Sequence, residues 1–498
     1  MTESAAFPLP FLASHRVPVA PARTVREREM MRLSAGIRGK SRWFDKMHDA
    51  EIVAGWTREA AEQGLTDAQI RYVLAELAHY AELRDEADGI EVSAVDGVWQ
   101  SDSLIGDGLR SRLREAVRVL EEVPAEELDW HPGSDEQVLD LVHPSLFCLV
   151  RSVSPVDDAV WQGPRERDAR YAHSEKFQWL PTDVEVGADG VAVFRSYVNN
   201  VDPVAHAELE SVLPLLFARV RPLFENVLSD LRNPKPVRIK TNPWSWYDNA
   251  PDKPVEPDED DEDQDEDAYD EYRQAYEEWW HHRRPVVPDA PEYTPPAAVD
   301  RIDLRGRLQV IVKLANIHLT PEKPEYLGGS WHVEGMLNES IVATAIYYWE
   351  SENITDSHLS FRAAIDEPNY EQNDHPGISE VFGLSDEDPL NQFLGSVPTT
   401  PGRCLAFPNI LQHRVGPFAL ADPTRPGHRK MLAFFLVDPA TTITSTADVP
   451  PQQPWSPTST MTLEQARTYR EELMRERKFF IGAHNEELYE REFSLCEH

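Results

Sequence analysis

YLGGSWHVEGMLNESIVATAIYYWE, residues 326–350, and CLAFPNILQHRVGPFALADPTRPGHRKMLAFFLVD, residues 404–438, are the two stretches that decide the fold. In the first, His332 and Glu334 stand two residues apart, so an extended chain directs both side chains to one face. In the second, His413 follows a short apolar run. Two imidazoles and one carboxylate are the ligand set that holds Fe(II) while leaving three coordination positions open. His332, Glu334 and His413 are therefore the candidate metal ligands.

The pattern around these ligands resembles the Fe(II)/2-oxoglutarate-dependent oxygenase superfamily, in its prolyl-hydroxylase-like form. It runs over about residues 305–440 and comprises His332-x-Glu334, the strand ATAIYYW, the turn PGRCLAFPN, His413-x-Val415-x-Pro417, and Arg429 opening the strand RKMLAFFLVD. The whole chain also resembles an uncharacterised domain-of-unknown-function family, with recurring phrases such as VDGVWQSDSLI, FQWLPTDVE and LQVIVKLANIHLTPEKPEY.

This resemblance implies a fold, cofactors and an activity. The fold would be α+β, with a double-stranded β-helix core, a mainly helical N-terminal region and a C-terminal helix. Fe(II) would bind the three ligands, and 2-oxoglutarate and O2 would be cosubstrates in a hydroxylation that releases succinate and CO2. Arg429 would bind the far carboxylate of 2-oxoglutarate, and Tyr348 is a weaker candidate for the same carboxylate. The usual carboxylate ligand in the superfamily is aspartate, and Glu334 is one methylene longer.

Other residues compete for these roles. Arg403, Arg414, Arg425 and His428 lie near Arg429 in the sequence, but Arg429 begins the apolar strand, and a guanidinium can meet a carboxylate with two parallel hydrogen bonds. Lys430 would point to the other face of that strand. Asn316 and His318 share one face of the preceding strand and are candidates for lining the pocket, although a structural role is more usual for such residues.

A second metal site is conceivable in DWHPGSDEQVLDLVHPSLF, which contains His131, Asp135, Asp140 and His143. Both histidines precede a proline and so lie on turn-like chain without a fixed spacing to a partner. A structural role is the commoner reading of these residues. The same holds for any single histidine or His-x-Glu pair, and only the conjunction of features singles out residues 326–438.

Three functions compete. The first is hydroxylation of a small molecule, favoured by the large scaffold around the predicted core. The second is a protein or peptide hydroxylase, which an open groove with acidic edges would favour. The third is a non-catalytic scaffold that keeps the fold without turnover. A metal-dependent cupin that acts without 2-oxoglutarate is also compatible with the ligand set.

The hydrophobic patterning predicts the remaining elements. Thr66 and Gln69 form a capping box before a helical stripe from Ile70 to Tyr80, and Thr462 and Gln465 form another before the C-terminal helix. A helix over 209–231 is expected to kink or restart at Pro214 and Pro222. The loop 366–400 shows no convincing regular element apart from the segment around NQFLG. Five regions are predicted: helical 1–125, mixed 126–250, an acidic flexible insertion 251–300, the catalytic core 301–440, and a linker with a helix 441–498.

Composition excludes several classes of protein. The formal charge of −38 repels nucleic acids and anionic membranes, and much of it is concentrated in DEDDEDQDED at 258–267. No apolar run reaches the roughly 18 residues of a membrane span. The N-terminus is a poor signal peptide, and three widely spaced cysteines, Cys148, Cys404 and Cys496, favour a reducing, cytoplasmic setting. The oligomeric state is not readable from the sequence.

Overall fold

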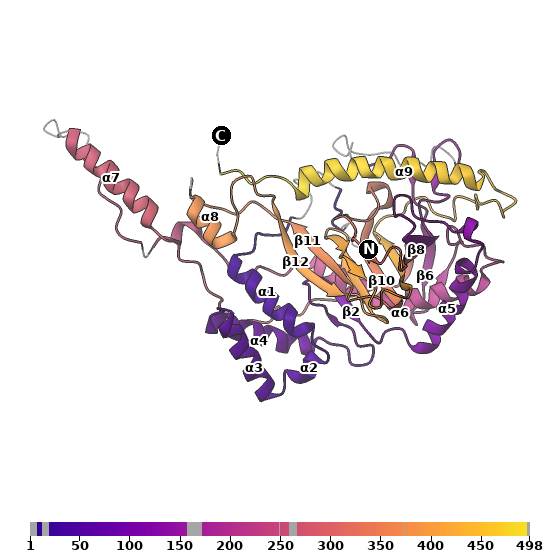
Figure 1. Ribbon diagram of the computed structural model, residues 1–498, viewed down its shortest axis with the longest axis horizontal. Coiled ribbons are helices and arrows are strands. Elements are labelled where there is room, and N and C mark those ends of the chain that lie inside the picture. Colours follow the sequence, from indigo (N-terminus) through magenta and orange to yellow (C-terminus); the bar gives the residue numbers. More distant parts are fainter. Residues whose placement is uncertain are drawn as a thin grey trace.

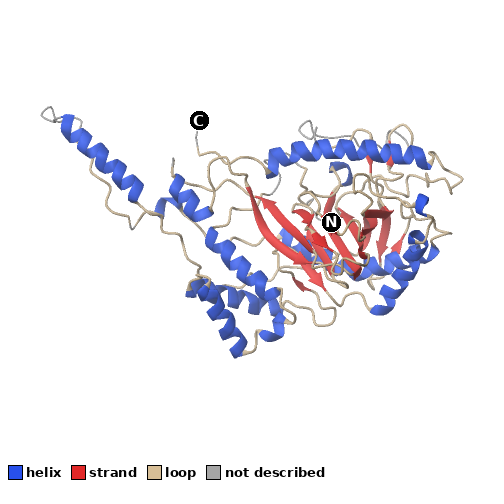
Figure 2. Cartoon of the chain, viewed as in Figure 1, coloured by secondary structure: helices blue, strands red, loops and turns tan. Residues whose placement is uncertain are grey.

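A computed structural model describes residues 7–11, 19–156, 172–248, 250–257, 266–372 and 374–495. These residues form a mixed structure of helices and sheets, in which all the strand pairs are antiparallel (Figures 1 and 2). The acidic run at 258–265 and Cys496 lie outside the described residues. No described helix is long and apolar enough to cross a membrane.

The N-terminal part of the chain is largely helical, as predicted. The capping box of Thr66 and Gln69 is present, and Ile70, Val73 and Tyr80 of the following helix are buried. Two short strands, β1 (Glu91–Val92) and β2 (Trp99–Ser101), lie between the fourth and fifth helices and join the main sheet. The helices of this part are α1 (Val25–Arg38), α2 (Trp43–Lys46), α3 (Ala50–Glu62), α4 (Asp67–Glu82) and α5 (Asp107–Glu121).

The main sheet holds the predicted strands ATAIYYW and RKMLAFFLVD. Its order is β1-β2-β13-β10-β16-β8-β6-β7, and β3 pairs with β8 off this path. Strands from the first 200 residues thus extend the sheet that carries Arg429. The bounds of the strands not yet given are β3 (Val138–Val142), β6 (Thr182–Val186), β7 (Ala192–Phe194), β8 (Gly306–Leu319), β10 (Ile341–Glu352), β13 (Cys404–Pro408) and β16 (Gly427–Val437).

A smaller sheet has the order β12 (Asn391–Pro398), β11 (His358–Ala364) and β14 (Gln412–Val415). The chain alternates between the sheets: β10 lies in the main sheet, β11 and β12 in the small one, β13 in the main, β14 in the small and β16 in the main. Two further pairs are two-stranded sheets, β15 (Phe418–Ala419) with β9 (Glu325–Tyr326) and β4 (Leu149–Val150) with β5 (Phe177–Gln178).

Two apolar cores lie on opposite faces of the main sheet, because successive side chains of a strand point to opposite faces. On β16, Phe434 packs against Phe217 of helix α6 (Ala207–Arg232), with ring centroids 5.6 Å apart. The next residue, Phe435, belongs to the core shared with the small sheet, together with Phe361 and Phe407. We call this second core the inter-sheet core.

Helix α6 is continuous, and the predicted restart at its prolines is wrong. Both Pro214 and Pro222 lie inside the helix. Each proline interrupts the backbone hydrogen bonding at a cost of about 3 kcal/mol. The helix buries a long apolar stripe against the sheet, and each large side chain contributes roughly 1.5–3 kcal/mol. Burial of residues such as Leu216, Phe217 and Phe224 therefore outweighs the two breaks.

In the segment 366–400, strand β12 lies at the predicted exception, NQFLG, whereas helix α8 (His375–Phe382) was not predicted. Within 251–300, helix α7 (Glu266–His282) projects away from the rest of the molecule (Figure 1). The C-terminal helix α9 (Leu463–His484) begins with the predicted capping box of Thr462 and Gln465 and lies along one side of the sheets (Figure 1). A short π-helical turn, Asn485–Tyr489, follows it.

Candidate metal centre

The segment that carries His332 and Glu334 lies beside strand β14. His332 and His413 exchange two backbone hydrogen bonds, of 3.2 and 3.0 Å. Gly328 allows this close approach: its φ is +94°, and a Cβ there would meet the Val415 carbonyl oxygen at 2.9 Å. Pairing of these two segments brings residues 332 and 413, far apart in the sequence, to adjacent positions.

Asn409 fixes the position of Glu334. Its buried side chain accepts a hydrogen bond from the Glu334 backbone N–H at 2.8 Å and donates to the Glu334 carbonyl at 2.9 Å. It also donates to the Ile341 carbonyl at 2.9 Å. Asn409 belongs to the turn between β13 and β14, so one side chain connects the His-x-Glu segment to the turn that leads to His413.

The three candidate ligands converge. Ligand atoms of His332, Glu334 and His413 all lie within 4.8 Å of one another. Oε1 of Glu334 lies 3.7 Å from Nε2 of His332 and 3.3 Å from Nε2 of His413. An ion held by bonds of about 2.1 Å brings adjacent ligand atoms to within roughly 3 Å of one another. The longer glutamate therefore reaches a position from which a single ion could contact all three side chains.

One face of the group is protected and the other is accessible. The side chain of His413 is 4% exposed and that of His332 is 36% exposed. His413 packs against Phe361 and Phe407, with ring centroids 6.4 and 4.7 Å away. The ligands therefore stand at the boundary of the inter-sheet core, with an approach from the side of His332.

Hydrogen bonding sets the tautomer of His332. Its Nδ1 lies 2.9 Å from the carbonyl oxygen of Ser330, which can only accept, so Nδ1 carries the proton and donates it. In the neutral ring Nε2 is then the nitrogen without a proton, available to a metal, and in the protonated ring it carries the proton that faces Glu334. A backbone carbonyl holding the far nitrogen is the arrangement that orients histidine ligands of metals.

Charges within the group are coupled. Burial disfavours the charged form of His332, but its hydrogen bond to Glu334 and the charge of Glu334 outweigh this and raise the His332 pKa. Burial would raise the pKa of Glu334, yet the two histidines hold it well below its usual range. Burial, followed by the charge of His332, lowers the His413 pKa. Glu334 is therefore an ionised carboxylate, and His413 presents a neutral imidazole.

Arg429 and Tyr348 form a second polar feature on the inner face of the main sheet. Arg429 is 2% exposed, and its guanidinium carbon lies 4.6 Å from the centre of the Tyr348 ring. None of its three guanidinium nitrogens has a hydrogen-bond partner among the described residues, and neither does the Tyr348 hydroxyl. Burial raises the pKa of Tyr348, and the nearby guanidinium offsets part of that rise. These unsatisfied donors fit a carboxylate ligand.

The residues that compete with Arg429 are already engaged. Arg403 donates two hydrogen bonds to Asp102, at 2.7 and 2.8 Å. Lys430 faces the opposite side of the sheet, as predicted, 2.9 Å from Glu121 and 3.1 Å from Glu350. The other three also have neighbours: Arg425 pairs with Asp422, His428 with Glu350, and Arg414 lies over the Trp331 ring. Arg429, in contrast, has no carboxylate within salt-bridge distance among the described residues.

Asn316 has the structural role that is the more usual one for such residues, and its side chain does not face the inter-sheet core. Asn316 donates to Glu121 at 2.6 Å on the face away from the inter-sheet core. Lys313 lies instead on the inner face: it pairs in register with Ala433, and the inner-face residue Ile311 is two positions before it. Both faces of β8 are apolar and buried, so the alternation of its sequence did not reveal which face was the inner one.

His131, Asp140 and His143 also come together, because β3 places Asp140 between the histidines. His131 Nδ1 lies 2.8 Å from Asp140 Oδ2, and Arg470 lies 4.0 Å from the same oxygen. His143 Nδ1 accepts the Ser145 backbone N–H at 3.2 Å, so Nε2 keeps the proton, and burial lowers the His143 pKa to about 3. The expectation of no fixed spacing was wrong, but the hydrogen bonding is that of a structural network. Asp135 lies apart, near Lys323.

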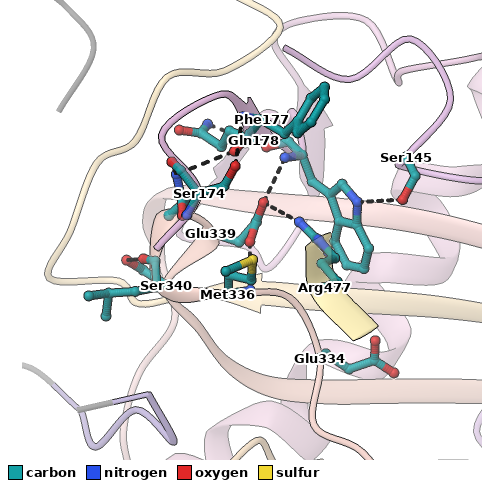
Figure 3. A network of polar contacts seen from close by, with 12 residues as sticks. Ser145, Ser174, Phe177, Gln178, Glu334, Met336, Glu339, Ser340 and Arg477 are labelled. Atoms are coloured by element: carbon teal, nitrogen blue, oxygen red, sulfur yellow. Dashed lines mark hydrogen bonds and ion pairs between the residues drawn. The ribbon is translucent and has the colours of Figure 1, made fainter. Parts of the chain in front are cut away.

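A buried ion pair that no sequence pattern indicates supports the loop after Glu334. Glu339 is fully buried and accepts hydrogen bonds from the Arg477 side chain at 2.6 Å, the Trp179 N–H at 2.8 Å and the Met336 N–H at 2.6 Å (Figure 3). Arg477 belongs to α9. The C-terminal helix is therefore connected to the loop that begins at the candidate ligand.

Two family models match the chain. The model described as "Protein of unknown function (DUF4246)" matches residues 67–458, and "Domain of unknown function DUF4246, N-terminal" matches residues 1–59. No curated protein matches.

Solved structures are only distantly similar. The dioxygenase for auxin oxidation (DAO) in rice is 13% identical, with coverage of 81% of this chain and 92% of that one and a TM-score of 0.25. The Fe(II)/α-ketoglutarate-dependent dioxygenase TqaL is 15% identical, and the match covers 47% of this chain and 81% of that one with a TM-score of 0.19. A bsmA homolog from Methylobium petroleophilum PM1 is 13% identical, with coverage of 28% of this chain, less than half (45%) of that one, and a TM-score of 0.17. Scores this low do not establish a shared fold.

Proposed function

The chain belongs to the DUF4246 family, and we propose that it is an Fe(II)- and 2-oxoglutarate-dependent dioxygenase with a double-stranded β-helix core. The alternation of β10 to β16 between two antiparallel sheets supports this core, since a jelly roll is wound in this way. His332, Glu334 and His413 would bind the iron. Arg429 and Tyr348 would bind the far carboxylate of 2-oxoglutarate.

The observation that carries the proposal is the unpaired guanidinium of Arg429. A buried charge without a partner costs several kcal/mol, so natural proteins seldom keep one without a ligand. Arg429 shares the inner face of the main sheet with Tyr348, and His413 borders the same core. An anion that also reaches a metal at the three ligands would satisfy both features. The metal-dependent cupin without 2-oxoglutarate leaves Arg429 unexplained.

Iron, 2-oxoglutarate and O2, when bound, supply the oxidising power for hydroxylation of a C–H bond, with release of succinate and CO2. The protein's own groups bind and orient. The Ser330 carbonyl keeps the proton of His332 on Nδ1, and Asn409 holds the Glu334 backbone. Phe361 and Phe407 cover His413 and exclude water from that side. A small-molecule substrate and a cytoplasmic setting are part of this proposal.

Anaerobic titration of the purified apoprotein with Fe(II) and then 2-oxoglutarate tests the proposal. The weak visible charge-transfer band of the chelated cosubstrate is expected in the wild type and should be absent in His332→Ala. Arg429→Ala tests the role of Arg429 in binding 2-oxoglutarate. Its matched control is Arg425→Ala, because Arg425 is exposed and paired with Asp422. Iron binding without the band would favour the cupin. Failure to bind iron would leave a scaffold.

A further inference from the structure

A cavity of about 530 Å³ lies between the helical region and the end of the two sheets. Its walls come from α4, from the C-terminal end of α6, from the segment around Tyr293 and from the small sheet. Cavities of roughly 300–1,000 Å³ are typical of small-molecule sites. None of the candidate metal ligands lines it, so its relation to them has to be derived from the strands.

The cavity meets the inter-sheet core next to His413. Ala363 of β11 and Leu411 line the cavity and belong to that core. Phe361 and His413 pair in register, and each stands two residues from one of these cavity residues along its own segment. Two residues of extended chain span roughly 7 Å. The cavity therefore begins at Ala363 and Leu411, two residues along the chain from Phe361 and from the candidate ligand His413.

Most charges of the cavity neutralise one another. Arg238 pairs with Glu76 at 3.0 Å, with Asp96 at 2.8 Å and with Glu27 at 3.6 Å. Arg23 lies 3.8 Å from Glu27, and Arg38, which stands outside the cavity lining, lies 3.5 Å from Asp96. Three guanidinium groups thus match three carboxylates. The charges of this network therefore balance one another and leave no net charge for a ligand.

Two opposite charges in the lining remain without such partners. Asp230 accepts a hydrogen bond from the Trp99 indole at 2.9 Å, and no cation lies within salt-bridge distance of it among the described residues. Burial raises the Asp230 pKa, an effect that Lys235 only partly offsets. Lys235 lies 4.6 Å above the Tyr80 ring and has no carboxylate partner in the described part of the chain. The cavity therefore offers one anionic and one cationic group.

The rest of the wall is aromatic and apolar. The rings of Tyr72 and Tyr293 meet edge to face with centroids 5.2 Å apart, and His79 lies 6.2 Å from Tyr293. Val227, Leu231 and Leu394 complete this surface. Rings and alkyl groups of this kind favour a flat or branched apolar body over a strongly hydrated one.

We propose that this cavity binds the primary substrate of the enzyme, and that the substrate is a zwitterion with an aromatic or apolar body, of amino-acid to dipeptide size. Its amino group is bound at Asp230 and its carboxylate at Lys235. The oxidation of this ligand rests on the proposed function. Its binding in the cavity does not.

Fluorine NMR with 4-fluoro-L-phenylalanine tests the binding. The apoprotein is expected to bind this probe, whereas Lys235→Met and Asp230→Asn should each weaken binding at least tenfold. Lys240→Met is the matched control, since Lys240 is exposed and lies outside the lining, and its affinity should equal that of the wild type. The single-charge analogues 4-fluorophenethylamine and 3-(4-fluorophenyl)propionate should bind less tightly. Absence of binding by the wild type, or wild-type affinity in both charge variants, would overturn the proposal.

Proximity to the metal centre is tested separately. Mn(II) added to the wild type should broaden the fluorine signal of the bound probe, and in His413→Ala the probe should bind without this broadening. Binding in the wild type without broadening by bound Mn(II) would refute the substrate role. Probe binding that depends on Lys235 in a protein that binds no metal would support the cavity as a ligand site while contradicting the oxygenase assignment, so the two failures are distinguishable.

Discussion

Arg429 carries a buried charge that the described residues do not neutralise. Its guanidinium touches the Tyr348 ring, and hydrogen bonds to its nitrogens are missing. Removal of a buried charge that lacks a partner relieves its desolvation cost, whereas removal of a satisfied one breaks favourable contacts. In the apoprotein, an apolar residue in place of Arg429 should therefore increase stability. In the ligand-bound protein, where the guanidinium has a partner, the same replacement should not.

Arg429→Met should accordingly raise the free energy of unfolding of the apoprotein by about 1–4 kcal/mol. The same change should weaken 2-oxoglutarate binding roughly 10- to 150-fold, as expected for loss of hydrogen bonds to a charged group, while metal affinity stays constant. Denaturant unfolding and calorimetric titration measure these quantities. Arg425→Met should alter neither. A destabilised Arg429→Met protein would show that the guanidinium has a partner within the chain.

Metal binding should release a proton from His332. Glu334 raises the His332 pKa, so in mildly acidic solution the metal must displace a proton from this ring. Affinity for Mn(II) should fall as the pH falls through that pKa, because the protonated ring cannot be a ligand. Calorimetry at roughly pH 6, near the ordinary histidine pKa, in two buffers of different ionisation enthalpy counts the protons.

Glu334→Gln is the variant that tests this linkage. Without the carboxylate the His332 pKa should fall, fewer protons should be released, and Mn(II) should bind more weakly. Identical heats for the wild type in both buffers would mean that the ring is already neutral before the metal binds.

The sequence located the candidate ligands because their signals are local. His332 and Glu334 share one short segment, and the apolar run before His413 marks a strand. Arg429 was preferred over its neighbours because it begins the apolar strand β16, and alternation along that strand set Lys430 aside. Alternation does not distinguish the two faces of β8, because both are buried, so the sequence left open whether Asn316 lines the pocket or has a structural role. Contacts between side chains that are far apart in the sequence cannot be predicted from such local patterns.

Helix α9 connects to the loop after the candidate ligand Glu334 through Arg477 and Glu339 (Figure 3). These residues are 138 positions apart in the chain, which is why no sequence pattern links them. The capping boxes of α4 and α9 and the helical stripes, in contrast, were predicted correctly. Helix α6 shows the limit of local rules: its prolines predict a break, and burial against the sheet prevents one.

Arg477→Ala should reduce the free energy of unfolding by about 3–5 kcal/mol, because it leaves Glu339 buried without its cation. Mn(II) affinity should also fall, since Glu339 holds the loop that follows Glu334. Arg475→Ala is the control from the same helix, where the side chain is exposed. The double variant Arg477→Met, Glu339→Gln should recover part of the stability. Unchanged metal affinity in Arg477→Ala would limit the pair to a purely structural role.

The molecule consists of a compact body and one projecting helix, α7 (Figure 1). The segment leaves and returns at one place: the Trp279 indole donates to the Pro251 carbonyl at 2.6 Å, and Arg283 lies 3.8 Å above the Tyr247 ring. Contacts such as Lys253 over Tyr276 are internal to the projection. Its two ends are therefore held together by the body of the protein.

Replacement of residues 252–278 by a short glycine–serine linker should change the free energy of unfolding by less than about 1 kcal/mol, the range of surface changes. Metal and 2-oxoglutarate affinities should stay the same. Denaturant unfolding and the anaerobic titration compare the two proteins. A large loss of stability would mean that the projection packs on the body in solution.

The link between Arg477 and Glu339 also bears on the order in which the protein can mature. Ribosomes synthesise a chain from its N-terminus, so the loop with His332 and Glu334 emerges well before the helix that contains Arg477. Until that helix docks, Glu339 lacks its cation, and the loop lacks the support described above. If the proposed function holds, iron would therefore load only after α9 has docked, and a translation product that stops before Arg477 would carry the three candidate ligands without this support.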